Sequence, residues 1–369
     1  MKRVCGLICA ALLSVSLSGA PALAACPVEA LQAQTPARVT QDVSAHVRID
    51  APVRMGLLPG ITAVSVRDAR LLSFLDTPPS IFSAAPVVRE EDMHFCYTYD
   101  VYGKAQHFEG GASLYRWSDG NISFWDAHGD AVGRVWHLYR AEIEMLPPEA
   151  SAGAERALEK ALQAAEAVGF PASRDAWACA FLSAETVAAY LERFSQDAPK
   201  SAFQQLDTLA ERLGEGCYVF TFPAVYEGLA LEDFFYISPA NGEHITARPL
   251  EVIVASDELL SFGAMNACEA AAVRRQAAEV LSLQEATGAL AARLAQEPPS
   301  APMVVYEISF AYGLEATDDG PDVFSLVPCW FFRGIDRDIF LGPAQAFESA
   351  KDANTTLFML NAVSGEWVS

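Results

Sequence analysis

Basic residues are scarce in this chain of 369 residues. Lys and Arg together number 25 against 47 Asp and Glu, so the formal net charge is −22 at pH 7. A surface of this charge repels nucleic-acid backbones and anionic lipid headgroups, and we therefore expect no nucleic-acid partner. Because 52% of the residues are hydrophobic, the chain is still apolar enough to fold, in roughly two or three domains.

Recognised catalytic and cofactor motifs are missing as well. The sequence contains no Gly-x-Ser-x-Gly, Ser-x-x-Lys or His-Glu-x-x-His, no phosphate-binding loop and no dinucleotide fingerprint. The stretch Asp126–Asp130 carries imidazole and carboxylate groups that could bind a metal, but a polar turn is the favoured interpretation. Asp318, Asp319 and Asp322 miss the spacing of a calcium loop. We therefore predict no catalytic residue, no metal, no cofactor and no enzymatic activity.

Cysteines are few and do not pair by spacing. Beyond residue 26 there are five, an odd number, which argues against a disulfide framework. None forms Cys-x-x-Cys, so buried free thiols are expected. A single bridge, for example between Cys179 and Cys217, stays open if the chain reaches an oxidising exterior. The five are Cys96, Cys179, Cys217, Cys268 and Cys329.

The first residues indicate export. Lys2 and Arg3 precede an uncharged, mostly apolar run from Val4 to about Leu17, followed by small residues. This is the pattern of a secretory signal. The run is too short, and too broken by Gly19 and Pro21, for a good membrane span of about 20 apolar residues.

The end of this segment offers two ways of processing. Leu23-Ala24-Ala25-Cys26 resembles the bacterial lipobox, which implies removal of residues 1–25 as a lipoprotein signal peptide and acylation of Cys26. Two or more acyl chains would hold the chain at the outer face of the cytoplasmic membrane. Cleavage after Ala24 fits equally well and leaves Cys26 as a plain thiol. Residues 26–40 lack periodicity, which predicts a flexible tether.

Residues 41–146 are expected to form a β-rich N-terminal domain. Apolar and polar residues alternate from Val43 to Ile49, which indicates a half-buried strand. The runs Leu114–Trp117 and Ile122–Trp125 flank an Asp-Gly turn, a strong hairpin signal. A short helix is expected from Asp68 to Leu75, where three leucines share a face.

Two further modules of one design are expected after this domain. In residues 150–262, an amphipathic helix from Ala154 to Val168 and two extra helices precede an antiparallel meander. In residues 266–369, Ser282 and Glu285 form a capping box that begins another helix. Strands follow in the same order.

The repeat can be stated more closely. The final strand, Leu357–Ala362, is predicted to correspond to Phe235–Pro239, and each is followed by a turn containing glycine. The strand at Cys329 is predicted to correspond to that at Cys217. Internal correspondence of this kind indicates a duplicated supersecondary unit.

A family resemblance rests on three stretches. Leu326-Val327-Pro328-Cys329-Trp330-Phe331-Phe332 and Leu360-Asn361-Ala362-Val363-Ser364-Gly365-Glu366 resemble PepSY-type modules, with Ser364 in place of the usual Thr. Val47-Arg48-Ile49-Asp50-Ala51-Pro52-Val53 resembles the N-terminal strand of uncharacterised Gram-positive surface lipoproteins related to membrane-associated regulators of a cell-wall sensor kinase. The resemblance implies an envelope location and a role in binding other membrane or envelope proteins.

Aromatic residues concentrate in the N-terminal domain. Most of them are expected in the core of its sheet. If some lie on an exposed face beside the Asp119-Gly120 turn, they could bind a sugar or a peptide, and the outer strands could accept a partner strand. The candidate binding residues are Tyr115, Trp117, Trp125 and Trp136.

These observations predict an α+β protein with an N-terminal antiparallel β domain and two PepSY-like modules of helix and antiparallel sheet. The expected function is non-catalytic: an extracytoplasmic lipoprotein, anchored through Cys26, that binds protein or peptide partners and regulates an envelope process. The alternative is a lipoprotein that binds carbohydrate or a small solute, and an envelope hydrolase without recognised motifs is third. The sequence specifies neither the partner nor the oligomeric state.

Overall fold

The chain forms an α+β structure built on two large sheets. The computed structural model describes residues 25–96, 100–140, 142–143, 145–146, 152–195, 206–237, 244–317, 323–344, 347, 350–351 and 354–368. The α+β class predicted from the sequence is confirmed, with mostly antiparallel strands. No helix among these residues has both the length and the apolar character needed to cross a bilayer.

The first sheet has seven strands, in the order β18-β4-β21-β20-β3-β2, with β22 also paired to β21. Its neighbours are antiparallel except β3 and β20, which run parallel. The strands are β2 (Arg38–Asp42), β3 (Val47–Met55), β4 (Val64–Leu71), β18 (Cys268–Ala277), β20 (Met303–Ala316), β21 (Val323–Asp336) and β22 (Thr356–Asn361).

The second sheet has nine strands, in the order β5-β6-β7-β8-β17-β16-β11-β10-β9. All of its pairs are antiparallel. The strands are β5 (Val87–Cys96), β6 (Asp100–Phe108), β7 (Ser113–Trp117), β8 (Ile122–Trp125), β9 (Met145–Leu146), β10 (Ala178–Ser183), β11 (Gly216–Phe222), β16 (Leu250–Ala255) and β17 (Glu258–Ala264).

Helices and short strand pairs complete the fold. The helices are α1 (Val28–Gln34), α2 (Gly129–Tyr139), α3 (Ala152–Ala167), α4 (Ala184–Ser195), α5 (Leu206–Leu213), α6 (Leu283–Gln296) and α7 (Arg337–Phe340), with a 3₁₀ turn at Pro79–Ile81. The short pairs are β1 (Ala25–Pro27) with β19 (Glu279–Leu281), β12 (Val225–Tyr226) with β13 (Leu229–Ala230), and β14 (Phe234–Ile237) with β15 (His244–Ala247).

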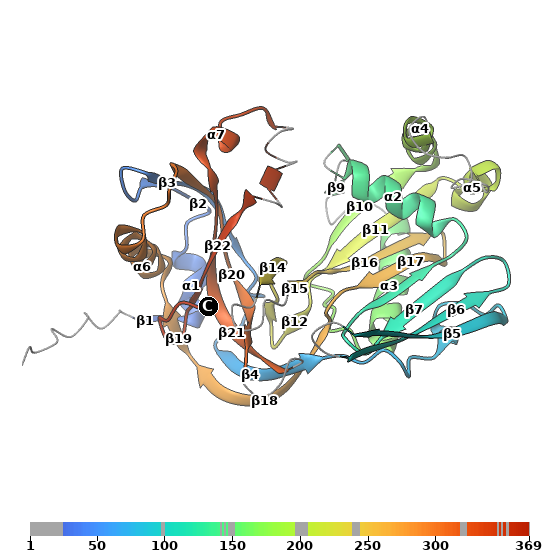
Figure 1. Ribbon diagram of the computed structural model, residues 1–369, viewed down its shortest axis with the longest axis horizontal. Helices are drawn as coiled ribbons and strands as arrows, with labels where there is room; N and C mark the ends of the chain where they lie inside the picture. Colours follow the sequence, from blue (N-terminus) through green and yellow to red (C-terminus); the bar gives the residue numbers. More distant parts are fainter. Residues whose placement is uncertain are drawn as a thin grey trace, which may run out of the picture.

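The nine-stranded sheet is formed by a segment inserted between two strands of the seven-stranded sheet. The chain forms β2 to β4, then the strands of the second sheet, and returns to the first sheet through β18, which pairs with β4 (Figure 1). The sheets therefore divide the chain differently from the expected segments 41–146, 150–262 and 266–369. Alternation along β3 indicates a buried face, but it does not identify the partner strand. That partner is β20, far along the chain.

Helices cover the two faces of the nine-stranded sheet unequally. On one face α3 packs against Phe220 and Val252. On the other, α2, α4 and α5 cover β10, β11, β16 and part of β17, through a cluster that includes Leu182, Ile253 and Leu260. The part of this second face formed by β5 to β8 has no helix on it among the described elements (Figure 1).

Two segments of the chain have a similar order of elements, although the strands that correspond differ from those predicted from the sequence. In α3-β10-β11-β16 and in α6-β20-β21-β22, a helix leads into three strands, each paired antiparallel to the next. The counterpart of β22 is thus β16. The predicted counterpart, β14, instead pairs with β15 outside the large sheet. Two pairs of short strands, β12 with β13 and β14 with β15, lie between β11 and β16 in the sequence.

Several local predictions are confirmed. The helix predicted at Ala154–Val168 is α3, and the strands flanking the Asp-Gly turn are β7 and β8. Gly120 in that turn has φ 78°, a left-handed conformation that glycine adopts without strain. The capping box of Ser282 and Glu285 is complete.

Two local predictions are wrong. Residues predicted as a helix from Asp68 to Leu75 form β4 up to Leu71, because pairing with β18 and β21 overrides the leucine pattern. The tether predicted at 26–40 is structured: it contains β1, α1 and most of β2, and the side chains of Val28 and Leu31 are buried.

The cysteines within the described residues are buried free thiols, namely Cys26, Cys179, Cys217, Cys268 and Cys329. The suggested bridge between Cys179 and Cys217 is ruled out by register. Cys179 pairs with Phe220, and Cys217 pairs with Leu182, so the two thiols lie on opposite faces of the sheet. The Cys96 side chain lies outside the described part, so its predicted free thiol is not tested.

Candidate functional site

Three of the four predicted aromatic residues lie on one face of the nine-stranded sheet. Along β7, Leu114 and Arg116 are buried, while Tyr115 and Trp117 between them are half-buried; Trp125 on β8 is half-buried too. Directly opposed residues share a face, and Ser113 pairs with Trp125 while Tyr115 pairs with Ser123. We call the surface formed by Phe95, Tyr115, Trp117 and Trp125 the aromatic face.

The rings of the aromatic face contact one another. Tyr115 and Trp125 meet edge to face, with ring centroids 5.5 Å apart. Phe95 on β5 lies 5.2 Å from Trp117, and its side chain is 42% exposed. Such pairs restrict ring motion and add about 0.5–1.5 kcal/mol to each contact. The row is therefore pre-organised and open to solvent at its β5 end.

The position of Trp117 depends on a glycine in the neighbouring strand. Gly103 on β6 is its register partner. A Cβ atom added to Gly103 would lie 2.2 Å from Cε3 of Trp117, so the indole ring occupies the space that a side chain would need. A glycine inside a strand often marks such a close approach, but the sequence does not show which ring fills the space.

Trp136 does not belong to the aromatic face. It lies on α2, is 5% exposed, and donates a hydrogen bond from Nε1 to Oε1 of Glu251 at 3.1 Å. Together with Val132 and Val135 it packs in the cluster beneath α2. The prediction that Trp136 contributes to an exposed platform is therefore wrong, because helix periodicity turns this residue toward the sheet.

Small polar groups border the aromatic rings. Ser113, Ser123 and Ser261 are half-buried on the same face. Nδ1 of His107 lies 3.0 Å from Oγ of Ser113, which resembles part of a hydrolase dyad. The ring centroids of His107 and Tyr115 are 6.1 Å apart, and no carboxylate contacts the imidazole among the described residues. An acid that orients the histidine, as in a Ser-His-Asp triad, is thus not in place there.

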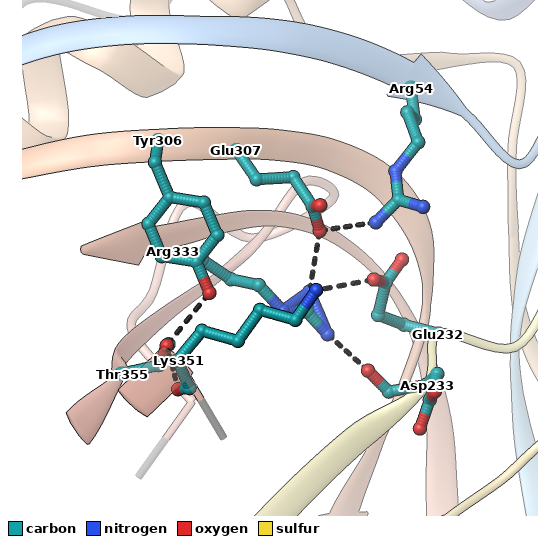
Figure 2. Close-up of polar contacts among 8 residues, drawn as sticks. All are labelled: Arg54, Glu232, Asp233, Tyr306, Glu307, Arg333, Lys351 and Thr355. Atoms are coloured by element: carbon teal, nitrogen blue, oxygen red, sulfur yellow. Dashed lines mark hydrogen bonds and ion pairs between the residues drawn. The ribbon is translucent and has the colours of Figure 1, made fainter. Parts of the chain in front are cut away.

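A second cluster of charged groups lies on the seven-stranded sheet. Figure 2 shows Arg333 on β21 between Glu307 on β20 and Glu232, which follows β13. Nη1 of Arg333 lies 2.8 Å from Glu232 and 3.1 Å from Glu307, and Nη2 donates to the carbonyl oxygen of Asp233. Arg54 on β3 pairs with Glu307 as well.

This charged cluster connects the segment that follows β13 to the seven-stranded sheet. Glu232 is only 10% and Arg333 14% exposed. Burial raises the pKa of Glu232 above its ordinary value, while Arg333 acts in the opposite direction. Each charge faces an opposite one, as buried charges require. We therefore assign the cluster a structural role. No sequence motif identifies it, because its members come from four separated segments.

Nearby polar contacts extend the cluster toward the C-terminal segment. The hydroxyl oxygens of Tyr306 and Thr355 are 2.7 Å apart (Figure 2), and Thr355 also donates to the carbonyl oxygen of Lys351 at 2.5 Å. These bonds fix the chain before β22.

Cys26 is buried in the folded chain. It is 5% exposed within β1, opposite Val280 on β19, and its Sγ lies 3.3 Å from Oε1 of Gln34. Burial raises the pKa of its thiol. Because the thiolate is the reactive form, this cysteine is poorly reactive in the folded chain.

The polar segment Asp126–Asp130 caps a helix. Oδ1 of Asp126 accepts hydrogen bonds from the backbone N–H groups of His128 and Gly129, at 2.8 and 2.7 Å. Satisfying the first free N–H groups of α2 is a usual role for Asp. Among the described residues no group of three or more His, Cys, Asp or Glu is arranged to hold a metal ion. Asp318, Asp319 and Asp322 lie outside the described residues.

Comparison with known proteins supports the fold but names no activity. No family model and no curated protein matches the chain. A solved structure described as an uncharacterized protein from Eubacterium rectale is similar, with a TM-score of 0.62 and 12% sequence identity. The match covers 90% of this chain and 94% of that one, so the two chains have a similar fold over most of their length.

Proposed function

We propose that this chain is an exported, non-catalytic binding protein of the cell envelope, and that the aromatic face contacts a partner protein or peptide. The observation that carries the proposal is the row of Phe95, Tyr115, Trp117 and Trp125, which no described helix covers. Aromatic side chains are enriched at protein interfaces and dominate their energetics. Phe95 is exposed and the other three residues are half-buried, so the row presents part of its apolar surface to solvent, as interaction sites commonly do.

Carbohydrate binding is the second candidate, supported by the same rings and by the bordering serines. The ring planes differ by 62° for Tyr115 and Trp125 and by 45° for Phe95 and Trp117. They therefore do not offer one flat platform for a row of sugar rings. This geometry supports side chains of a peptide as the ligand more than a polysaccharide.

Export follows in this proposal from the signal-like first residues, and the position of Cys26 bears on how they are removed. A lipid on Sγ of Cys26 requires β1 to leave β19, where Ala25 pairs with Leu281 and Cys26 with Val280. Cleavage after Ala24 requires no such change. The buried thiol thus supports cleavage after Ala24 and a free mature protein, while the lipid-anchored form at the outer face of the cytoplasmic membrane is the alternative.

Intact-mass measurement of natively expressed protein separates the two forms of processing. We expect a mature chain beginning at Ala25 with an unmodified thiol at Cys26. A mass showing a chain that begins at Cys26 and carries acyl groups would establish the anchor instead.

The helix-plus-three-strand units also fit the proposed relationship to PepSY-type modules. In each, a helix precedes an antiparallel meander of three strands. Under this proposal the regulatory role of such modules at the envelope, in holding another protein, extends to this chain.

The binding proposal is tested with native envelope extract and purified cell-wall polysaccharide, each offered separately to immobilised protein. Replacing Trp125 by Ala should abolish specific retention of an envelope protein, since aromatic hot spots contribute about 2 kcal/mol or more. Tyr190→Ala is the matched control, because Tyr190 stacks on Tyr139 at 4.4 Å, away from the aromatic face. Retention of polysaccharide alone, lost in Trp125→Ala, would favour the second candidate. Retention unaffected by Trp125→Ala would refute both.

A further inference from the structure

The strand at the open end of the aromatic face has an unpaired edge. β5 is the terminal strand of the nine-stranded sheet and pairs only with β6 among the described elements. It is 10 residues long, longer than most strands of that sheet. Val87 is 42% and Val88 65% exposed. A long exposed edge of this kind offers a row of backbone N–H and C=O groups to an added strand.

The charge of β5 selects among possible added strands. Glu90, Glu91 and Asp92 follow one another on it and are exposed, and Arg89 forms an ion pair with Glu91, so these four residues carry a net charge of −2. In a chain of net charge −22, such an edge repels a second copy of itself and attracts a cationic segment. Edge charges also prevent aggregation, and here they do so without excluding a basic partner.

Register places Glu91 on the side of the sheet that carries the aromatic rings, whereas its neighbours Glu90 and Asp92 point to the opposite side. Glu91 pairs with Ala105 on β6, which in turn pairs with Tyr115 on β7. Met93, Gly103 and Trp117 form the next row on the same face. The residues of β6 between the acidic strand and the rings are therefore small. Long cationic side chains reaching inward from an added strand would meet a carboxylate first and ring edges or faces beyond it, where cation–π contacts form.

We propose that β5 accepts an extended segment of a partner protein, rich in Lys or Arg, as an added antiparallel or parallel strand bordering the aromatic face. This inference rests on the proposed function and specifies the chemistry of its partner. Main-chain hydrogen bonds to β5 supply affinity, and alternate side chains of the segment supply specificity.

Synthetic peptides as long as β5 test the mode of binding in the intact protein. The first alternates Lys and Thr, the second alternates Glu and Thr, and the third is the Lys-Thr peptide with every backbone amide N-methylated. We expect binding of the first that weakens with salt. The methylated peptide should bind about tenfold more weakly or worse, because it lacks backbone hydrogen-bond donors along both edges. The Glu-Thr peptide should not bind.

Amide hydrogen exchange locates the added strand. The Lys-Thr peptide should slow exchange in residues 87–96 and leave β18, the equally long edge strand of the other sheet, unchanged. Slowing in both strands would indicate unselective edge pairing and overturn the proposal. Slowing in neither would also overturn it, and β5 would then be a charged edge that only prevents aggregation. Self-association of the protein through β5 would overturn it too.

Two variants separate this inference from the function on which it rests. Joint replacement Glu91→Gln and Asp92→Asn should weaken Lys-Thr binding about threefold to tenfold, whereas Glu155→Gln with Glu185→Gln on α3 and α4 should not. If methylated and plain peptides bind equally and both require Trp125, the aromatic face stands and strand addition fails. If peptide binding requires β5 but not Trp125, strand addition stands and the proposed role of the aromatic face fails.

Discussion

At the scale of single residues, Arg333 has the clearest structural role. It joins β21, β20 and the segment after β13 through two carboxylates and one carbonyl oxygen. Removing one member of a buried ionic cluster leaves its partners charged and without compensation, which costs more than the pair contributes when intact. The cluster therefore allows predictions of the free energy of unfolding and of its dependence on pH.

Replacing Arg333 by Met should lower the free energy of unfolding by about 3–5 kcal/mol, because Glu232 would lose its compensating charge. Urea unfolding measures this loss. Arg38→Met is the control: Arg38 pairs with Asp50 but is 57% exposed, and exposed pairs contribute about 0–1 kcal/mol. Equal losses in the two variants would contradict the structural role of Arg333.

Glu232 should make stability depend on pH. Burial raises its pKa in the folded chain above the ordinary value of 4.5, with Arg333 opposing this shift. The folded state then holds the proton more tightly, so the contribution of Glu232 is complete below about pH 4.5 and is lost as pH rises through the raised pKa.

The corresponding experiment compares wild type with Glu232→Gln. The difference in unfolding free energy, wild type minus variant, should fall as pH rises from about 4.5 through the raised pKa. Unfolding by urea at a series of pH values measures it. A difference that stays constant over this range would show that Glu232 has the same pKa in both states.

At the scale of elements, the aromatic face depends on the fit of β6 against β7. Gly103→Ala should displace the Trp117 ring, since the new Cβ would lie 2.2 Å from Cε3. We expect a loss of about 1–3 kcal/mol in unfolding free energy and a change in tryptophan emission. Gly263→Ala on β17 is the control, because no heavy atom lies within 4 Å of its new Cβ. An unchanged emission spectrum in Gly103→Ala would contradict the packing described.

Elements with strong local signals could be predicted from the sequence. The stripe of α3, the capping box of α6 and the turn between β7 and β8 each depend on residues close together in the chain. The suggestion that some aromatic residues beside the Asp119-Gly120 turn share a face fits Tyr115, Trp117 and Trp125. Trp136 was predicted wrongly because the stretch after β8 was not identified as the helix α2. The leucines near residue 71 wrongly predicted a helix for another reason. Pairing of β4 with distant strands determines the structure there.

At the scale of the whole molecule, the order of strands could not be predicted. β3 pairs with β20 and β4 with β18 and β21, contacts that span most of the chain. Nothing in a local pattern encodes such partners. The same limit applies to the contacts that β13 and the residues after it make with the seven-stranded sheet. There the N–H of Glu232 donates to the carbonyl oxygen of Tyr312 at 3.0 Å, and the N–H of Ala230 donates to the carbonyl oxygen of Gly56 at 2.8 Å.

Among the described elements, one part of one sheet has no covering helix. Helices cover the nine-stranded sheet on both sides over β10, β11 and β16, whereas no described helix lies on the aromatic side of β5 to β8. The described elements thus form a well-packed support that carries the aromatic face. The function proposed here is assigned to that face alone.

The most direct test of that assignment places a photocrosslinking amino acid at Ser123, opposite Tyr115 on the aromatic face, or at Ala188, exposed on α4. After irradiation of intact cells, Ser123 should give a discrete crosslinked partner protein that is absent when Trp125 is replaced by Ala. Ala188 should give none. The same products at both positions, or no product at Ser123, would contradict the account.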